Sequence, residues 1–294
     1  MQYLEKEKYQ QRLAQRQRTG KIFEIMCIIS ITIGIGMLAL LLWYVADQGL
    51  HKLDWQFLTS FPSRFPERAG IYGALLGTLY VIGTGGLIAF VLGVGTAIYL
   101  EEYANDNRLS RILQVNIANL AGVPSIVYGI LGLEIFVRFA GLGRSVLAGS
   151  LTIALLILPI VIIASQEALK AVPSSIREGG FALGASKWQV VSILVIPQAF
   201  ASILTGVILA VSRAIGETAP LIVMGALTFV PFAPDGFMSP FTVLPIQIFN
   251  WVSRPQHGFH EIAAAGIVIL LITLILLNSV AIYLRHKFSK NLEG

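Results

Sequence analysis

The chain has 294 residues, of which 55% are hydrophobic and only 13% charged, and its formal net charge is +5. Soluble domains carry about twice that fraction of charged residues, so the composition excludes an ordinary soluble protein. With one cysteine, Cys27, and four histidines that lack zinc-motif spacing, we expect neither an internal disulfide nor a bound metal.

Six apolar runs, each long enough to cross a bilayer, follow a polar and basic N-terminal segment, residues 1–21. The first run is too long for the core of a signal peptide, so we expect it to be an uncleaved helix. No polar segment is long enough for a separate core. The sequence therefore predicts an all-α integral membrane protein with one transmembrane domain, residues 22–284, and a polar tail, residues 285–294. The runs cover residues 22–46, 71–100, 112–139, 146–165, 199–230 and 262–284.

The basic residues predict the orientation of these spans. Fourteen Lys and Arg residues lie in the N-terminal segment, residues 101–112, residues 167–197 and the tail, against six in the alternate loops. Positive charge favours the inner side, so both termini and the polar segment 166–197 are expected in the cytoplasm. Loops 47–70 and 231–261 are then external. The basic residues lie at membrane boundaries without a recognition motif, so we expect no nucleic-acid partner and a membrane-lipid environment.

Glycines and prolines mark the places where the spans pack or break. The glycines of the second run, including Gly83, Gly85, Gly93 and Gly95, favour close packing between helices. The third run is interrupted at Pro124 and Ser125, a break that a membrane tolerates only where it is buried in protein or lines a wet cavity.

Two shorter features concern the membrane boundary. Glu134 and Arg138 are four residues apart near the end of the third run, so we expect a local ion pair rather than a role in transport. The aromatic residues Phe241, Phe249 and Trp251 are expected at the membrane interface.

The polar segment 166–197 predicts two helices joined by a bend. Ser175 and Glu178 form a capping-box pattern that predicts a helix start, and Gly184 suits a left-handed helix end. Ser186 and Gln189 repeat the pattern for a second helix. The exposed residues of the first helix can enter a groove of a partner protein; the alternative is a helix lying on lipid.

Glu178-Gly179-Gly180, then Gly184, then Ile196-Pro197 resembles the "EAA" loop of permease subunits of bacterial ATP-binding-cassette (ABC) importers, with glycines in place of both alanines. The resemblance implies a coupling helix that docks on a cytoplasmic ATPase. Its contact residues would be Glu178, Gly179, Gly180, Phe181, Ala182 and Gly184.

The fifth run contains two charges. Arg213 and Glu217 are four residues apart and share a helix face, and Pro220 predicts a deformed backbone nearby. One interpretation is a static ion pair. The other is a site on a solute pathway, because the forked guanidinium matches tetrahedral oxyanions and the carboxylate can displace them.

Residues 212–222, Ser-Arg-Ala-Ile-Gly-Glu-Thr-Ala-Pro-Leu-Ile, resemble the A-type permease subunit of phosphate-specific ABC importers. The resemblance implies the type I importer permease fold, a bacterial plasma membrane and a pathway lined by Arg213, Glu217 and Thr218. The implied partners are a C-type sister permease in a heterodimer, two ATPase subunits and an external phosphate-binding protein.

No GxxxxGK[ST] loop occurs in the chain, so we expect no enzyme activity and no cofactor of its own. ATP and Mg²⁺ would be used by the partner ATPase. Two alternatives stay open: a permease for another oxyanion, such as molybdate or sulfate, and a membrane signalling scaffold.

Overall fold

The computed structural model describes residues 2–105, 107–226 and 229–293, and its regular elements within those ranges are helical. They are α1 (Gln2–Gly49), η1 (Leu50–Lys52), α2 (Trp55–Thr59), η2 (Pro66–Arg68), α3 (Tyr72–Ile98), η3 (Tyr99–Tyr103), α4 (Arg108–Ala121), α5 (Ser125–Gly132), η4 (Leu133–Phe139), α6 (Val146–Lys170), α7 (Ser174–Ala182), α8 (Lys187–Gln189), η5 (Val190–Val195), α9 (Ile196–Ile215), α10 (Ala219–Met224), α11 (Leu244–Val252) and α12 (His257–Glu293).

Five helical stretches in the described residues are long and apolar enough to cross a membrane, and the number is six if one bent pair of helices counts as a single span. The pair is Arg108–Ala121 with Ser125–Phe139, which meet at 105°. The all-α membrane fold is thereby confirmed. The fifth span runs over Lys187–Ile215 instead of 199–230, because its helix starts at the second capping box and ends at Gly216.

The core forms where α6 packs between α3 and α9. A Cβ added at Gly85 would lie 2.7 Å from the Ser150 carbonyl oxygen, and one added at Gly93 would lie 2.7 Å from Val161 Cγ1. These two glycines therefore allow α3 and α6 to approach closely, as expected. Gly83 and Gly95 have no neighbour within 4 Å at the same position, so they do not contribute to packing within this chain.

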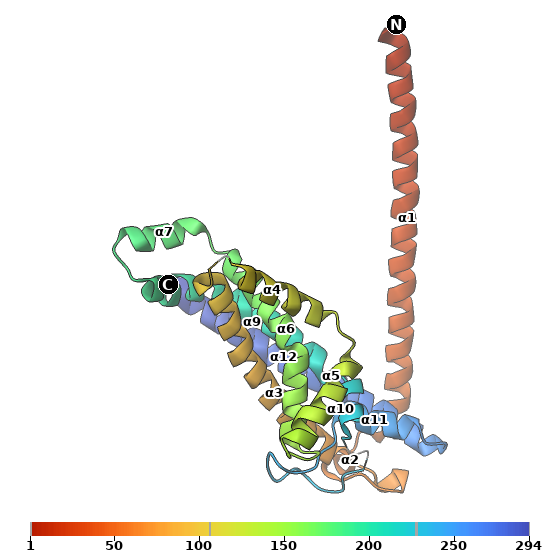
Figure 1. Cartoon of the computed structure of the whole chain (residues 1–294). Coiled ribbons are helices and arrows are strands. Elements are labelled where there is room, and N and C mark those ends of the chain that lie inside the picture. Colours follow the sequence, from red (N-terminus) through yellow and green to blue (C-terminus); the bar gives the residue numbers. More distant parts are fainter. Residues whose placement is uncertain (1, 106, 227–228, 294) are drawn as a thin grey trace.

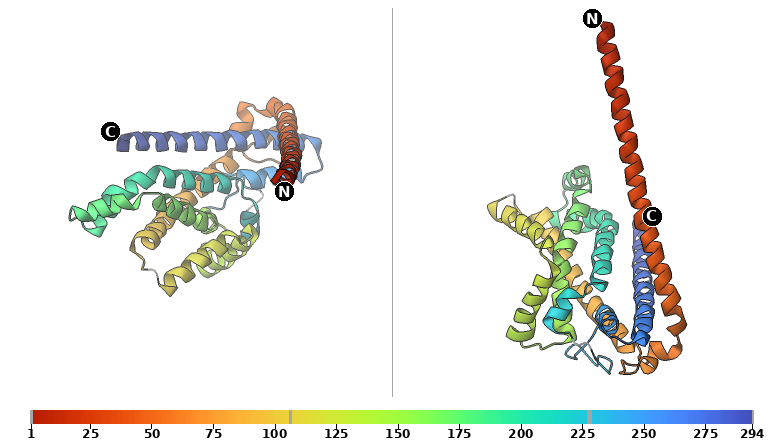
Figure 2. Two further views of the ribbon diagram at one scale, coloured as in Figure 1. Left: turned by 90° about the horizontal axis from the view of Figure 1, so that it is seen from above. Right: turned by 90° about the vertical axis from the view of Figure 1, so that its right-hand side faces the viewer.

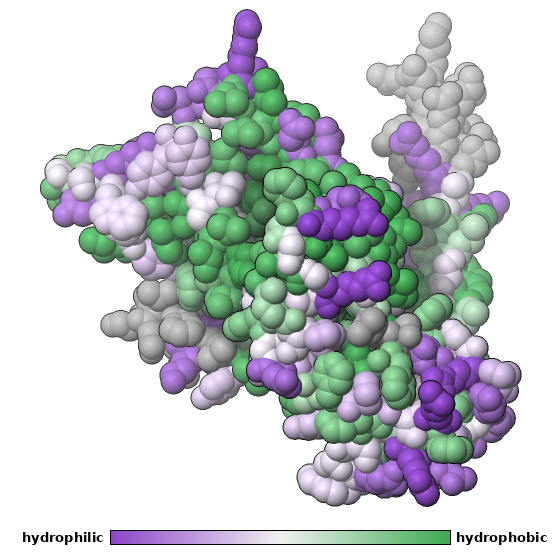
Figure 3. Space-filling model, turned by 60° about the horizontal axis from the view of Figure 1, so that its bottom comes forward, coloured by the Kyte–Doolittle hydropathy of each residue, from purple (hydrophilic) through white to green (hydrophobic). Residues whose placement is uncertain are grey.

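The first helix stands away from the rest of the molecule (Figures 1 and 2). Residues 16–44 of α1 are exposed, and within residues 16–49 the helix contacts the body near its end, where Val45 and Gly49 lie against α12. It begins at Gln2, so residues 2–21 of the basic segment extend the same helix rather than preceding it. Hydrophobic residues also cover much of the face shown in Figure 3, as a membrane protein requires.

The segment around α11 is buried, which makes the interface prediction wrong for two of its three aromatic residues. Phe241 and Trp251 are fully buried, whereas Phe249 is exposed. The main chain here packs on α3: the Thr78 hydroxyl accepts a hydrogen bond from the Leu244 amide at 2.8 Å. The two rings therefore fill the core at this end of the bundle instead of anchoring it at a lipid surface.

Candidate coupling hook and charged helix break

We call residues 173–197 the hook; its first helix, α7, projects from one end of the bundle, opposite α2 and α11 (Figure 1). Helix α7 begins at Ser174 after Pro173, and no side chain caps it, so the capping box expected at Ser175 is wrong. Proline fixes φ and lacks an N–H, which suits the entry to a helix without a side-chain cap.

The bend and the second helix start are confirmed. Gly184 has φ +81°, a left-handed conformation, and its N–H donates to the Phe181 carbonyl at 2.9 Å. The Ser186 N–H donates to Gln189 Oε1 at 2.8 Å, and the Gln189 N–H donates to Ser186 Oγ at 3.4 Å. From this capping box the chain continues through α8 and η5 directly into α9.

The residues of the expected coupling contact do not all face the same way. Glu178, Gly179, Ala182 and Gly184 are exposed, and Phe181 is 49% exposed. Leu183, just beyond the helix, is 91% exposed and adds an apolar group to this outer face.

Gly180 instead faces inward, where an added Cβ would lie 2.8 Å from Leu194 Cδ1 and 2.9 Å from Val190 Cγ2. The outer face of α7 is therefore open to a partner. On the inner face, the absence of a side chain at Gly180 lets α7 pack closely against η5.

The charged pair lies at a helix end. Helix α9 stops at Ile215, the Gly216 N–H turns back to the Arg213 carbonyl at 3.3 Å, and the Glu217 N–H turns back to the Ala214 carbonyl at 3.1 Å. Arg213 Nε and Glu217 Oε1 are 3.5 Å apart, so the expected contact between these two side chains is present. The Arg213 side chain is 61% exposed and that of Glu217 only 17%. Within the described part of the chain, no hydrogen bond ends on the terminal nitrogens of Arg213.

Although the Arg213–Glu217 pair lies at the end of helix α9, it is near the middle of the membrane-spanning bundle. Val211, two residues before Arg213, packs on α3 at Gly86, where an added Cβ would lie 3.2 Å from Val211 Cγ2. Gly86 is roughly midway along the span Tyr72–Tyr103. The break therefore places Arg213, Glu217 and Thr218 near mid-span, where a charge facing lipid costs about 2.5–3.5 kcal/mol on insertion scales.

The helices that follow the two predicted breaks, α5 and α10, pack against each other. Pro124 precedes the first residue of α5, Ser125, and Pro220 is the second residue of α10. A Cβ added at Gly129 of α5 would lie 2.6 Å from the Pro220 carbonyl oxygen, so the halves that follow the breaks are in backbone contact. This contact encloses the second break on one side.

A polar stripe on α9 adds to the site and was not foreseen. Gln198, Ser202 and Arg213 are all exposed, and their spacing places them within one sector of the helix. The buried residues of α9, such as Ile203 and Ala210, occupy another sector. Leu209, which is 66% exposed, lies in the same sector between Ser202 and Arg213, so an apolar side chain interrupts the stripe before the break. The helical spacing of the stripe is readable in the sequence once the helix limits are known.

The family model described as the binding-protein-dependent transport system inner membrane component matches residues 89–292. The chain belongs to this permease family. The probable ABC transporter permease protein YqgI of Bacillus subtilis is 31% identical to it over 95% of this chain and 99% of YqgI.

Relatives named phosphate transport system permease protein confirm the resemblance. PstA of Haemophilus influenzae is 31% identical over 92% of the permease and 96% of PstA, and PstA 1 of Mycobacterium tuberculosis strain H37Rv is 34% identical over 83% and 80%. A chain from inward-facing crystal structures of the MetNI methionine ABC transporter aligns with TM-score 0.60 at 15% identity, covering 73% of the permease and 94% of that chain. The permease therefore has the fold of ABC importer permeases.

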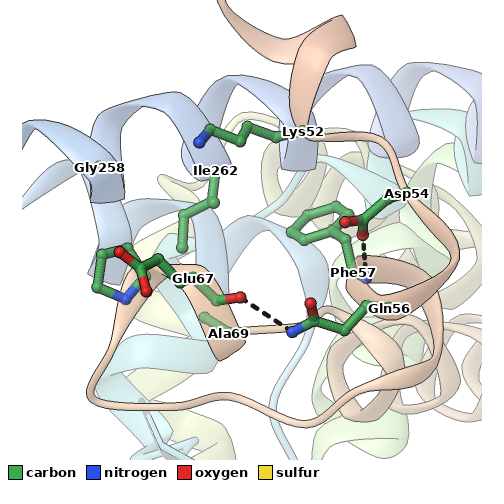
Figure 4. Close-up of a pocket in the computed structure, with 9 residues that line it drawn as sticks. Lys52, Asp54, Gln56, Phe57, Glu67, Ala69, Gly258 and Ile262 are labelled. Carbon is green, nitrogen blue, oxygen red and sulfur yellow. Dashed lines mark hydrogen bonds between the residues drawn. The ribbon is translucent and has the colours of Figure 1, made fainter.

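Polar residues elsewhere in the permease serve local structure. The expected Glu134–Arg138 ion pair is present and exposed. A pocket of about 300 Å³ lies near α2 and the start of α12 (Figure 4), where Asp54 caps α2 at the Phe57 amide, 2.7 Å away, and Gln56 donates to the Glu67 carbonyl at 3.0 Å. Among the described residues, no three His, Cys, Asp or Glu side chains are grouped to hold a metal ion.

Proposed function

We propose that this chain is the membrane-spanning permease subunit of an ATP-driven importer that moves inorganic phosphate by alternating access. The observation that carries the proposal is the Arg213–Glu217 pair at a helix break near mid-span, with an exposed guanidinium. The names of the PstA relatives support phosphate as the solute.

The geometry of the pair suits transient binding of an oxyanion. Two terminal guanidinium nitrogens of Arg213 remain available, and a forked donor pair matches two oxygens of a phosphate. Glu217 Oε1, 3.5 Å from Arg213 Nε, is too far for a strong hydrogen bond, but it is near enough to attract the guanidinium when the anion leaves. A site that binds strongly enough to admit an ion and weakly enough to release it is what transport requires.

The exposure of Arg213 supports a second permease subunit that covers this side of α9. A guanidinium this exposed at mid-span is costly against lipid, and the polar stripe of Gln198 and Ser202 on the same face adds to that cost. A C-type sister permease facing this side of α9 would enclose a hydrophilic pathway between the two subunits. Thr218, whose hydroxyl donates to the Gly216 carbonyl at 3.4 Å, would line it beside the pair.

The remaining partners are assigned by position. The outer face of α7, with Glu178 and Phe181, would dock on one of two cytoplasmic ATPase subunits, which bind the ATP and Mg²⁺. The termini and the hook would then lie in the cytoplasm of a bacterial cell, in agreement with the basic residues. Loops 47–70 and 231–261 at the opposite end would receive an external phosphate-binding protein.

Uptake of labelled phosphate by cells or proteoliposomes tests the proposal. The double variant Arg213→Gln with Glu217→Gln is expected to abolish uptake while the complex still assembles. Glu134→Gln with Arg138→Gln is the matched control, since it removes an ion pair of the same spacing at an exposed position away from the break. Normal uptake in the first double variant would exclude the pathway and favour a static pair or a signalling scaffold.

Competition by other anions tests the solute. Unlabelled phosphate is expected to block uptake far more effectively than sulfate or molybdate at equal concentration. Preferential competition by sulfate or molybdate would assign the permease to that oxyanion instead.

A further inference from the structure

Helix α7 has two charged residues, Arg177 and Glu178. The Glu178 side chain is exposed, whereas the Arg177 side chain turns inward, toward the end of α3. Its Nη2 donates to Glu102 Oε1 at 2.6 Å, and its Nε lies 3.2 and 3.3 Å from the two carboxylate oxygens of Glu102. Glu102 belongs to η3, which continues α3. The pair joins residues 75 positions apart in the sequence.

The same guanidinium also binds the end of α6. Nη1 donates to the Val172 carbonyl at 2.8 Å, and Nη2 donates to the Leu169 carbonyl at 3.0 Å. Carbonyls at a helix end lack partners within the helix, so a cation there satisfies them and complements the helix dipole. One side chain therefore ties α7 to both α3 and α6.

This contact is built as a rigid one. The side chain of Glu102 is only 7% exposed and that of Arg177 is 22% exposed. A forked, charge-assisted contact fixes direction as well as distance, and water competes little with it at this burial. If α7 moved and η3 did not, the buried charges of Arg177 and Glu102 would be separated, which is costly. The two elements are therefore expected to move together.

A second contact joins η3 to the other end of the hook. Lys187 Nζ, at the start of α8, lies 5.2 Å from the ring centre of Tyr103, the residue after Glu102. A cation over an aromatic ring is attracted by the negative face of the ring. The end of α3 is thus held by the hook on both sides of the Gly184 bend.

We propose that Arg177 and Glu102 form a clamp that transmits movement of the hook to α3, and through α3 to the charged break. The clamp rests on the proposed function, in which a partner ATPase moves α7. Helix α9 receives that movement through the main chain, and α3 receives it through the clamp. The two routes meet where Gly86 packs on Val211, two residues before Arg213. Arg177 and Glu102 are positioning residues, because neither lies at the break.

Thiol labelling at the break tests the clamp without reference to the solute. Cys27, the chain's single cysteine, is replaced by Ser, and Thr218→Cys then reports access to the break in the complex isolated from its native membrane. The labelling rate is compared between the nucleotide-free complex and the complex trapped with ATP, Mg²⁺ and orthovanadate. With the clamp intact we expect a change of about tenfold or more between the two states.

Glu102→Gln is expected to remove this difference to within about twofold while ATP hydrolysis continues. Glu167→Gln is the matched control, because it breaks an exposed ion pair with Lys170 beside the clamp and should leave the difference intact. Should Glu102→Gln prevent assembly, Arg177→Lys keeps the charge but loses the fork, and it should reduce the difference in the same way.

A merely structural clamp would lower the yield of the complex and leave the nucleotide-dependent labelling of the assembled fraction unchanged. That result, or an equal labelling rate in both states with the clamp intact, overturns the inference. Absence of phosphate uptake by the wild-type complex would instead overturn the proposed solute and leave the labelling result standing.

Discussion

Gly129→Ala tests whether the contact between α5 and α10 sets the position of the charged break. A Cβ at Gly129 would lie 2.6 Å from the Pro220 carbonyl oxygen and 2.7 Å from Pro220 Cα. Ordinary van der Waals contact begins at 3.4 Å, so the two helices would have to separate by roughly 0.8 Å. Both obstructing atoms belong to the main chain and cannot rotate away.

The expected cost follows from this overlap. Overpacking a tight contact typically costs about 1–3 kcal/mol, and we expect the upper part of that range because main-chain atoms obstruct the new Cβ. Alanine gains roughly 1 kcal/mol over glycine in a helix, so the net loss is up to about 2 kcal/mol. We therefore expect the apparent thermal unfolding midpoint of the purified complex to fall by several degrees. Because Pro220 follows the break directly, we also expect phosphate uptake per assembled complex to fall.

Gly83→Ala is the matched control, since an added Cβ there meets nothing within 4 Å in this chain. The measurement is the unfolding midpoint by tryptophan fluorescence, with uptake normalised to the amount of assembled complex. Equal midpoints for Gly129→Ala and the wild type would show that α5 and α10 separate freely, and the role assigned to their contact would have to be withdrawn.

Three further changes test the hook and the core. Glu178→Lys reverses the charge on the exposed face of α7 and should reduce co-purification of the ATPase or uncouple its activity from uptake; undiminished co-purification with full solute-stimulated hydrolysis would contradict this. Gly184→Ala forces a side chain into a left-handed conformation and should cost about 1–2 kcal/mol in thermal stability, whereas Gly179→Ala, with open space around it, should not. Phe241→Ala empties a fully buried site and should cost about 3–5 kcal/mol, seen as loss of folded protein, whereas Phe249→Ala at an exposed site should leave the yield unchanged.

Some features of the site were open to prediction because they depend on near neighbours in the chain. The bend at Gly184 follows from the freedom of glycine at positive φ, and the capping box at Ser186 needs only a residue three positions away. The box predicted at Ser175 failed for a local reason too: Pro173 takes the N-cap position two residues before Ser175, so Ser175 lies within the first turn.

Other features depend on residues far apart in the sequence. Glu102 and Arg177 each look like an ordinary boundary charge, and only the fold brings them to 2.6 Å. Phe241 and Trp251 are of the type found at membrane interfaces, yet both are buried: Phe241 packs on α6 at Gly149, and Trp251 packs among residues of α3 and α12.

The sequence by itself determined that this protein lies in a membrane and where several of its helices begin and end. Long apolar runs must lie in a bilayer, and glycines, prolines and capping residues mark where helices stop. The tertiary structure decided the depth of Arg213, the meeting of α5 with α10, and the attachment of the hook to α3. The physical reason is range: hydropathy and backbone preference act over a few residues, whereas the depth of a charge depends on which distant helix packs beside it.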